Sequence, residues 1–268
     1  MELSALLASQ IVLPSIPKVI ALLLSETERE PADLKKITQL ISTDPALTTR
    51  LLQTANSPVF QLSGKINSAS EALAILSLPH IRSMVVEAAS AASLKAVPGI
   101  HMQKFWAYSL NVAKIARSLA GVVKQNQGAA FTSGLIHAVG ELVMHVGMQD
   151  EIAAVDKNVS PLGLGREKAE YRAFGYCYAQ VGAGFARQWL FPQPIVDALE
   201  YQCEPFDNNA YEPLAGVIHL ANWRARAREA KLSEQAMVSS FPGSVGDVLG
   251  LDIDMVLQQD PIDWTRRR

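Results

Sequence analysis

Cysteine is scarce in this chain of 268 residues, which contains only Cys177 and Cys203 and no Cys-x-x-Cys pair. This excludes a disulfide framework and favours a reducing compartment. No stretch reaches the roughly 20 consecutive apolar residues that a membrane span needs. Glu2 stands where a secretory signal carries a basic residue, and Pro14 and Pro17 interrupt the apolar stretch that follows. We therefore expect a soluble cytoplasmic protein without a membrane contact.

Excess charge of either sign is also lacking. Lysine and arginine together number 24, and aspartate and glutamate number 26. The resulting net charge of −2 does not steer the whole chain toward nucleic acid or an anionic membrane. Binding of nucleic acid would require a local basic patch and is not expected.

Strand-type alternation of apolar and polar residues is nearly absent, whereas apolar residues recur at helical spacing almost throughout the chain. With 49% hydrophobic and 19% charged residues, the composition is that of an ordered globular protein with one large domain or two small ones. These features predict an all-α fold.

Helix-start signals divide the first part of the chain into short helices. Asp33 and Asp44 are typical N-cap residues, and Pro45 fits the first turn after Asp44 because its missing N–H has no partner there. Ser68 with Glu71 three residues later forms a capping-box pattern. The pattern predicts a bundle of short helices.

Pro98 and Gly99 form the clearest internal break. Beyond this break, the apolar spacing predicts two long helices, then shorter ones, and finally one amphipathic piece in the tail. The predicted ranges are 105–123, 129–148, 167–174, 178–190, 195–202, 212–230 and 247–257.

Motifs for metal or phosphate chemistry are weak. His137 and His145 lie eight residues apart on one predicted helix, too far apart for both to bind one ion at about 2 Å, and no HExxH motif occurs. A core position is the simpler interpretation for each. Gly163 and Gly165 precede Arg166, but a strand and a Lys-Ser/Thr pair are missing, so a plain loop is expected.

Basic residues do not form a binding stripe. Arg224, Arg226 and Arg228 are spaced by two, so they point in different directions on a helix. The arginines at 266–268 form a short tail, for which a solvated position is the simplest interpretation.

Several motifs occur together in one order and cover the chain from Leu6 to Lys231. They are Leu13-Pro14-Ser15-Ile16-Pro17, Ile41-Ser42-Thr43-Asp44-Pro45-Ala46-Leu47, Leu51-Leu52-Gln53-Thr54-Ala55-Asn56-Ser57, Phe105-Trp106 with Ser109-Leu110, Gly134-Leu135-Ile136-His137, and Glu170 followed by Phe174-Gly175. In these motifs the chain resembles the HDOD domain family. The resemblance implies an N-terminal helical bundle over residues 1–98, packed on an HD-like helical bundle over 99–231, with 232–268 as a C-terminal helical appendage.

HDOD domains are similar to HD phosphohydrolases, in which His and Asp side chains on neighbouring helices bind metals that activate water for attack on a phosphoester. The resemblance places those metal positions at Tyr108, His137, Ala138, Tyr178, Gln202, Cys203 and Asn222. Both carboxylates are thus replaced, by Ala138 and Asn222, and His137 is the one remaining imidazole. Tyr is a poor ligand at neutral pH because the phenol pKa is near 10. We therefore predict no metal, no cofactor and no catalytic residue.

What remains is a predicted vestigial pocket formed by Tyr108, His137, Tyr178, Gln202, Cys203 and Asn222. These side chains either hold the helices together by hydrogen bonds or bind a small polar ligand such as a nucleotide. A softer metal site rebuilt from His137, Cys203 and Cys177 is a further alternative, which no sequence spacing supports.

The resemblance implies a non-catalytic regulator in bacterial signal transduction, without an attached effector domain. Such a protein would act by binding another macromolecule, a protein partner near cyclic-dinucleotide pathways. Its mechanism would be a shift in helix packing between the two bundles. The alternative function is a metal-dependent phosphohydrolase of the HD type with substitute ligands.

Overall fold

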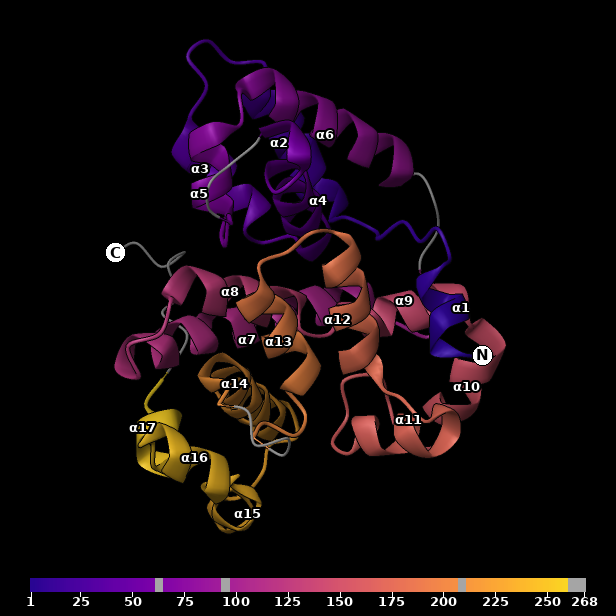
Figure 1. The fold of residues 1–268 in the computed structure, drawn as a ribbon, viewed down its shortest axis with the longest axis vertical. Coiled ribbons are helices and arrows are strands. Elements are labelled where there is room, and N and C mark those ends of the chain that lie inside the picture. The colour runs from indigo at the N-terminus through magenta and orange to yellow at the C-terminus, as the bar shows by residue number, and fades with distance from the viewer. Residues whose placement is uncertain (61–64, 93–96, 207–210, 260–268) are drawn as a thin grey trace.

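The computed structural model describes residues 1–60, 65–92, 97–206 and 211–259, and these residues form helices and their connections without a strand (Figure 1). The predicted all-α fold is therefore confirmed. The helices are α1 (Leu3–Leu7), α2 (Pro17–Thr27), α3 (Leu34–Ile41), α4 (Pro45–Ala55), the 3-10 helix η1 (Pro58–Phe60), α5 (Ala69–Ile75), α6 (Leu78–Ala92), α7 (Met102–Val122), α8 (Gln127–Ile136), α9 (Val139–Gly147), α10 (Gln149–Asp156), α11 (Arg166–Phe174), α12 (Tyr178–Gln188), α13 (Gln193–Tyr201), α14 (Pro213–Glu229), α15 (Glu234–Ser240), α16 (Gly243–Leu249) and α17 (Ile253–Leu257).

Helices α2 to α6 form an N-terminal bundle around one apolar core, which includes the fully buried Leu23, Ile37 and Leu51. Asp44 caps α4 as its position predicts, since its carboxylate accepts hydrogen bonds from the backbone N–H groups of Ala46 and Leu47 at 2.9 and 3.0 Å. The same carboxylate also accepts from the N–H of Ile16. The cap thus ties the segment before α2 to the start of α4.

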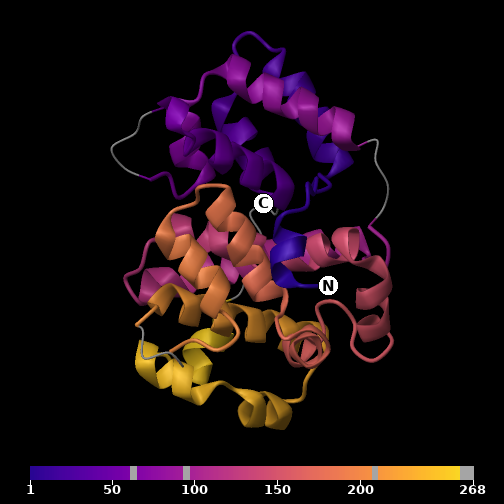
Figure 2. The ribbon, with the colours of Figure 1, turned by 45° about the vertical axis from the view of Figure 1, so that its right-hand side comes forward.

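Helices α7 to α14 form a second bundle around a larger core, in which α7 packs along α8 and α14, and α12 packs along α9 and α13. Helix α1 lies on this second bundle although it precedes the N-terminal one (Figures 1 and 2). Its Leu6 is fully buried in the larger core. The first residues of the chain therefore contribute to the second bundle.

The two bundles meet where α4 and the turn before α5 contact α8. Leu52 of α4 is part of the second core. The hydroxyl of Thr132 on α8 donates a 2.8 Å hydrogen bond to the carbonyl oxygen of Asn67. The side chain of Asn56 fixes this turn, because it donates to the carbonyl of Ile66 at 3.0 Å and accepts from its N–H at 2.9 Å.

The long helix predicted over 129–148 is wrong, because the structure breaks it at His137 and Ala138 into α8 and α9. Helix α9 lies so close to α12 that a Cβ atom on Gly140 would be 2.0 Å from the carbonyl oxygen of Tyr178. The break redirects α9 into this contact, and the carbonyl of His137 accepts from the side chain of Gln202 at 3.0 Å.

The stretch 127–147, which spans both helices, is long and apolar enough to cross a membrane by length and composition, with a mean hydropathy of 1.3. In the structure 89% of the most apolar 18-residue window of this stretch is buried inside the protein, where it forms part of the core of the second bundle. Its apolar character is thus explained by packing between helices.

The single amphipathic piece predicted over 247–257 is also wrong. Short helices α15, α16 and α17 occupy this end of the chain, and Gly250, at a φ of +67°, separates the last two. A left-handed conformation ends a helix, and glycine adopts it without strain. Helices α16 and α17 pack against α14. The arginines at 266–268 lie outside the described residues.

Candidate functional site

The six residues of the predicted vestigial pocket come together in the second bundle although they span 115 positions of the chain. Tyr108 lies on α7, His137 at the break between α8 and α9, and Asn222 on α14. Tyr178 is the first residue of α12, while Gln202 and Cys203 follow the end of α13. Five separate segments therefore supply the site.

Two buried phenols are joined through one amide. The hydroxyl of Tyr108 donates to the side-chain oxygen of Asn222, and the Asn222 side-chain N–H donates to the hydroxyl of Tyr178 at 3.5 Å. Burial raises the pKa of Tyr108 to about 12, and burial also raises the pKa of Tyr178. Both phenols therefore stay protonated at neutral pH.

His137 serves as a neutral packing residue. Its Nδ1–H donates to the carbonyl of Gly134 at 2.7 Å, and its ring lies on the ring of Tyr108 with centroids 5.6 Å apart. Burial lowers the pKa of His137 to about 3 because an imidazolium would lose its hydration there. At neutral pH the ring is uncharged.

His137 should make stability depend on pH below neutrality. An imidazole with an ordinary pKa of 6.5 in the unfolded chain and about 3 in the fold takes up a proton only on unfolding. Its contribution is therefore fully present above pH 6.5 and is lost as the pH falls toward 3, by about 1.4 kcal/mol per pH unit. In urea denaturation, the stability gap between the wild type and His137→Gln should shrink by about 2 kcal/mol between pH 7.5 and pH 5. The exposed His80 takes the same substitution as a control, and an equal narrowing there would contradict the prediction.

Arg226 is a site residue that the sequence analysis missed. Its guanidinium donates to the hydroxyl of Tyr178 at 3.3 Å and forms an ion pair with Glu167 at 3.2 Å. The Arg226 side chain is only 10% exposed, whereas the sequence analysis concluded only that the three arginines on this helix do not form one stripe. The signal that could have found it is local, since Arg226 lies one helical turn after Asn222 on the same face of α14.

A cavity of about 280 Å³ opens above these residues. Four of the predicted residues line it, whereas Tyr108 and His137 are absent from its lining. The wall is completed by residues that the sequence analysis did not assign to a site, which include the charged Arg226, Glu167 and Lys168 and the ring of His219. The full lining is Leu164, Gly165, Glu167, Lys168, Tyr178, Gln202, Cys203, His219, Asn222, Trp223, Arg226, Ser240 and Pro242.

The donor set of this site does not fit a divalent metal ion. It offers two protonated phenols, side-chain amides, the thiol of Cys203, and the imidazoles of His137 and His219, each of which already donates to a backbone carbonyl. The carboxylate of Glu167 in the cavity lining is paired with Arg226. Within the described part of the chain, no group of three or more His, Cys, Asp or Glu residues is arranged to hold a metal. A fixed guanidinium at 3.3 Å from the Tyr178 hydroxyl would also repel a dication bound by that oxygen.

A buried charge network fixes Tyr178 from the other side. The guanidinium of Arg166, which is fully buried, donates to Glu141 at 3.0 Å, to Glu170 at 2.7 Å and to Asp156 at 2.7 Å. Burial, together with the charge of Glu141 nearby, raises the pKa of Glu170 to about 10, so Glu170 keeps its proton at neutral pH. The second oxygen of Glu170 accepts from the N–H of Tyr178 at 2.8 Å. Arg166, expected in a plain loop, thus begins α11 and organises this network.

His145 belongs to this network and not to the site of His137. Its Nε2 lies 3.1 Å from Asp156, and its Nδ1 lies 2.7 Å from the carbonyl oxygen of Glu141. The prediction that the two histidines do not share one ion agrees with this separation into two clusters.

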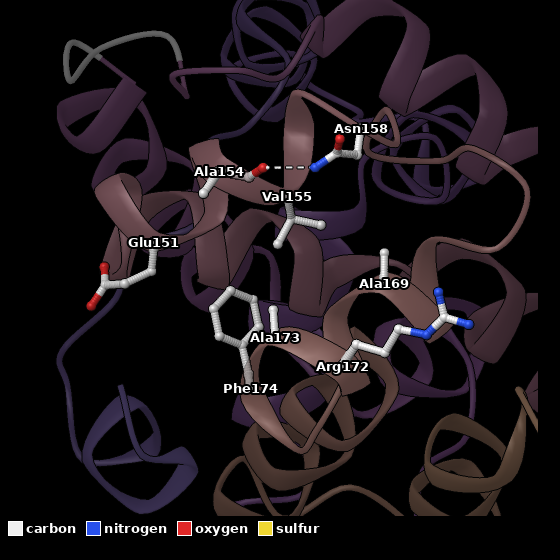
Figure 3. A pocket seen from close by; sticks show the side chains of 8 residues that line it. All are labelled: Glu151, Ala154, Val155, Asn158, Ala169, Arg172, Ala173 and Phe174. Carbon is white, nitrogen blue, oxygen red and sulfur yellow. Dashed lines mark hydrogen bonds between the residues drawn. The ribbon is translucent and has the colours of Figure 1, made fainter.

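A second cavity, of about 350 Å³, lies between α10 and α11 (Figure 3). Phe174 and Val155 form part of its apolar floor, while Glu151, Asn158 and Arg172 supply its polar groups. None of the predicted site residues lines it. Its only hydrogen bond among the residues drawn is local, from the side chain of Asn158 to the carbonyl of Ala154 at 3.4 Å.

Three comparisons place this architecture among known proteins. An uncharacterized protein of Treponema pallidum (strain Nichols) is 25% identical over 223 residues, and the match covers 80% of this chain but 42% of that relative. The MmoQ response regulator of Methylococcus capsulatus str. Bath has a TM-score of 0.73 at 24% identity, with 92% of this chain and 97% of that chain covered. An HDOD domain protein of unknown function from Geobacter sulfurreducens has a TM-score of 0.53 at 23% identity, with 95% and 90% covered.

These likenesses agree with the fold and with the order of motifs in the sequence. The family model of the HDOD domain matches residues 13–205. The match begins in the segment before α2, whose Ile16 donates to Asp44, and it ends after α13. The match therefore covers the N-terminal bundle and the second bundle as far as α13, with five of the six predicted pocket residues. Helix α14, which carries Asn222 and Arg226, lies beyond it. The chain belongs to the HDOD domain family.

Proposed function

We propose that this protein is a non-catalytic regulator that acts in bacterial signal transduction by binding another macromolecule. The observation that carries the proposal is the guanidinium of Arg226 beside Tyr178 and Asn222. In this family's catalytic relatives a metal would supply positive charge at such a site, whereas here an arginine supplies it permanently. A guanidinium cannot activate a water molecule as a Lewis acid, so the site lacks the means for hydrolysis.

A signalling role is supported by membership of the HDOD domain family and by the fold shared with a response regulator over 92% of this chain. We place the protein in the cytoplasm, with a protein as its partner in a pathway that uses cyclic dinucleotides. The match with the Treponema pallidum relative covers 42% of that protein. The activity of such a longer protein would depend on further segments as well.

Helix α8 gives the proposal a physical route between the bundles. The hydroxyl of Thr132 on this helix donates to the turn before α5. Five residues later, at the end of the helix, the ring of His137 packs on Tyr108 and its carbonyl accepts from Gln202. A partner that prefers one packing of the N-terminal bundle on α8 would shift the population toward that packing. The same shift would move the break at His137 and the wall of the cavity.

Metal analysis and hydrolysis assays test the proposal directly. The full chain, purified without chelators and then incubated with Mn²⁺, should retain far less than one equivalent of transition metal after gel filtration. It should also leave bis(p-nitrophenyl) phosphate intact. The expected reason is the donor set, which offers no carboxylate in place of Ala138 and Asn222.

Stoichiometric metal together with phosphodiester turnover would overturn the proposal, provided that His137→Ala abolishes the turnover and His80→Ala, on the surface, does not. Retention on DNA that weakens steeply with salt would identify a nucleic-acid binder instead. The positive test is co-purification of tagged protein from the native host, in which a protein partner should appear at constant stoichiometry.

A further inference from the structure

The cavity of about 280 Å³ lies where the start of α11, the end of α13 and one face of α14 meet. One water molecule occupies about 30 Å³ of the liquid, and pockets for small molecules begin at about 300 Å³. The cavity is therefore much larger than a single bound ion and close to the size that a compact organic molecule needs.

One end of the cavity carries positive charge. The guanidinium of Arg226 is almost fully buried, and its Nε–H has no hydrogen-bond partner within the part of the chain that the structure describes. The exposed Lys168 lines the same cavity. Glu167 is the only carboxylate among the lining residues, and it already pairs with Arg226 at 3.2 Å. Two cations against one carboxylate leave a positive site, which favours an anion.

The start of α11 adds to this preference. Gly165, at a φ of +75°, is the N-cap residue of this helix and offers no side chain to the N–H groups of the first turn. Unpaired N–H groups and the helix dipole attract an anion to such an N-terminus. Gly165 and Lys168 both line the cavity, so the first turn of α11 and the guanidinium of Arg226 border the same space.

Hydrogen-bond acceptors line the other end. Gln202 is buried, and its side-chain N–H groups donate to the carbonyls of His137 and Leu199 at 3.0 and 2.8 Å. The side-chain oxygen of Gln202 has no partner among the described residues. Nδ1 of His219 lies 2.7 Å from the carbonyl oxygen of Gln202 and therefore carries the hydrogen. Burial lowers the pKa of His219, so Nε2 of this ring is an acceptor at neutral pH.

The two ends are separated along α14. His219 precedes Arg226 by seven residues of this helix, which corresponds to about 10 Å along its axis. A ligand that meets both ends must therefore carry an anionic group at one end and O–H or N–H donors at the other.

We propose that this cavity binds a compact organic oxyanion, a phosphate or a carboxylate, that also carries hydroxyl or amino groups. The oxyanion contacts the guanidinium of Arg226, the ammonium of Lys168 and the start of α11. The hydroxyl or amino groups donate to Gln202 and His219. Binding of such a ligand supplies partners to two buried polar side chains, those of Arg226 and Gln202, that otherwise have an unpaired atom.

The inference rests on the proposed function in one respect, because it treats the cavity as a regulatory site and not as a catalytic one. The side chain of Gln202 also donates to the carbonyl of His137, at the break between α8 and α9. A ligand held by Gln202 should therefore favour one packing of α8 against the N-terminal bundle.

Isothermal titration calorimetry of the full chain at constant ionic strength tests the proposal with four probes. Glucose 6-phosphate and gluconate carry a phosphate or a carboxylate together with hydroxyl groups. Glucose lacks the anion, and inorganic phosphate lacks the hydroxyl-bearing body. At least one of the two organic oxyanions should bind with a Kd below about 1 mM, at least about tenfold tighter than glucose and inorganic phosphate. Comparison of the two distinguishes a phosphate site from a carboxylate site.

Variants with matched controls locate the binding. Arg226→Gln should weaken binding by at least about tenfold, because a charge-assisted hydrogen bond is lost in a buried site. Lys168→Gln removes an exposed charge and should weaken binding by about two- to fivefold without an effect on the fold. Arg172→Gln and Lys157→Gln, at exposed positions outside this cavity, should leave the affinity unchanged. Circular dichroism checks the fold of each variant.

Absence of binding for both organic oxyanions up to about 10 mM would overturn the inference, and so would equal effects of Lys168→Gln and Lys157→Gln. Neither result would contradict the proposed function, which co-purification of a protein partner tests separately. Binding of glucose 6-phosphate followed by its hydrolysis would instead contradict the non-catalytic function and leave the binding site in place.

Discussion

Substitution of Gly140 by alanine is expected to destabilise the protein by more than about 3 kcal/mol, the upper end of typical overpacking costs. A Cβ atom there would lie 2.0 Å from the carbonyl oxygen of Tyr178 and 2.9 Å from the backbone N of Gly182. Both obstacles are backbone atoms, so relief requires separation of α9 from α12. Urea denaturation, followed by circular dichroism, measures the loss.

Gly182, which faces Gly140 from α12, supplies the control. A Cβ atom on Gly182 would meet the backbone N of Gly140 at 3.7 Å, which is an ordinary van der Waals contact. Gly182→Ala should therefore be neutral or should stabilise α12 by up to about 1 kcal/mol through its higher helix propensity. Equal effects of the two substitutions would show that the close approach of α9 and α12 is not as the structure describes it.

Replacement of Arg166 by methionine is expected to cost about 3 to 5 kcal/mol at neutral pH, the range found when one partner of a buried ion pair is removed. The fully buried guanidinium is the common partner of Glu141, Glu170 and Asp156. Without it, carboxylates remain in a site with little water. Denaturation at pH 7.5 measures the effect.

Arg172 on the same helix provides the matched control, since its side chain is exposed and belongs to no such network. Arg172→Met should change the stability by no more than about 0.5 kcal/mol. An equally small cost for Arg166→Met would contradict the role of Arg166 as the common partner of these carboxyl groups.

The consequences of Arg166→Met should also reach the candidate site. Glu170 holds the N–H of Tyr178 at 2.8 Å, and the hydroxyl of Tyr178 in turn contacts Asn222 and Arg226. The network therefore links the stability of α11 to the geometry of the pocket. Glu170, which does not line the cavity, thus positions Tyr178, which does.

Local chemistry made much of the fold predictable. Asp44 caps α4, and the Ser68 hydroxyl accepts from the N–H of Glu71 at 3.3 Å, as their spacing indicates. Helical periodicity predicted the all-α class because each amphipathic helix carries its own signal. The convergence of Tyr108, Tyr178 and Asn222 was also predictable, but only through the resemblance to the HDOD family.

Features that depend on contacts between distant segments escaped the sequence analysis. The apolar spacing over 129–148 predicts one helix, because the neighbouring sequence carries no signal that Gly140 approaches the backbone of α12. Arg226, one turn after Asn222, was not assigned to the site, because its contacts with Tyr178 and Glu167 come from other helices.

The sequence by itself thus determined the all-α class and where several helices begin. Through the resemblance to the HDOD family it also predicted that Ala138 and Asn222 stand where HD phosphohydrolases carry carboxylates. Only the tertiary structure decided what surrounds these positions: a guanidinium beside a buried phenol, in a cavity between helices. The physical reason is that caps and periodicity act within a few residues of the chain, whereas burial and ion pairing arise between helices that the fold alone brings together.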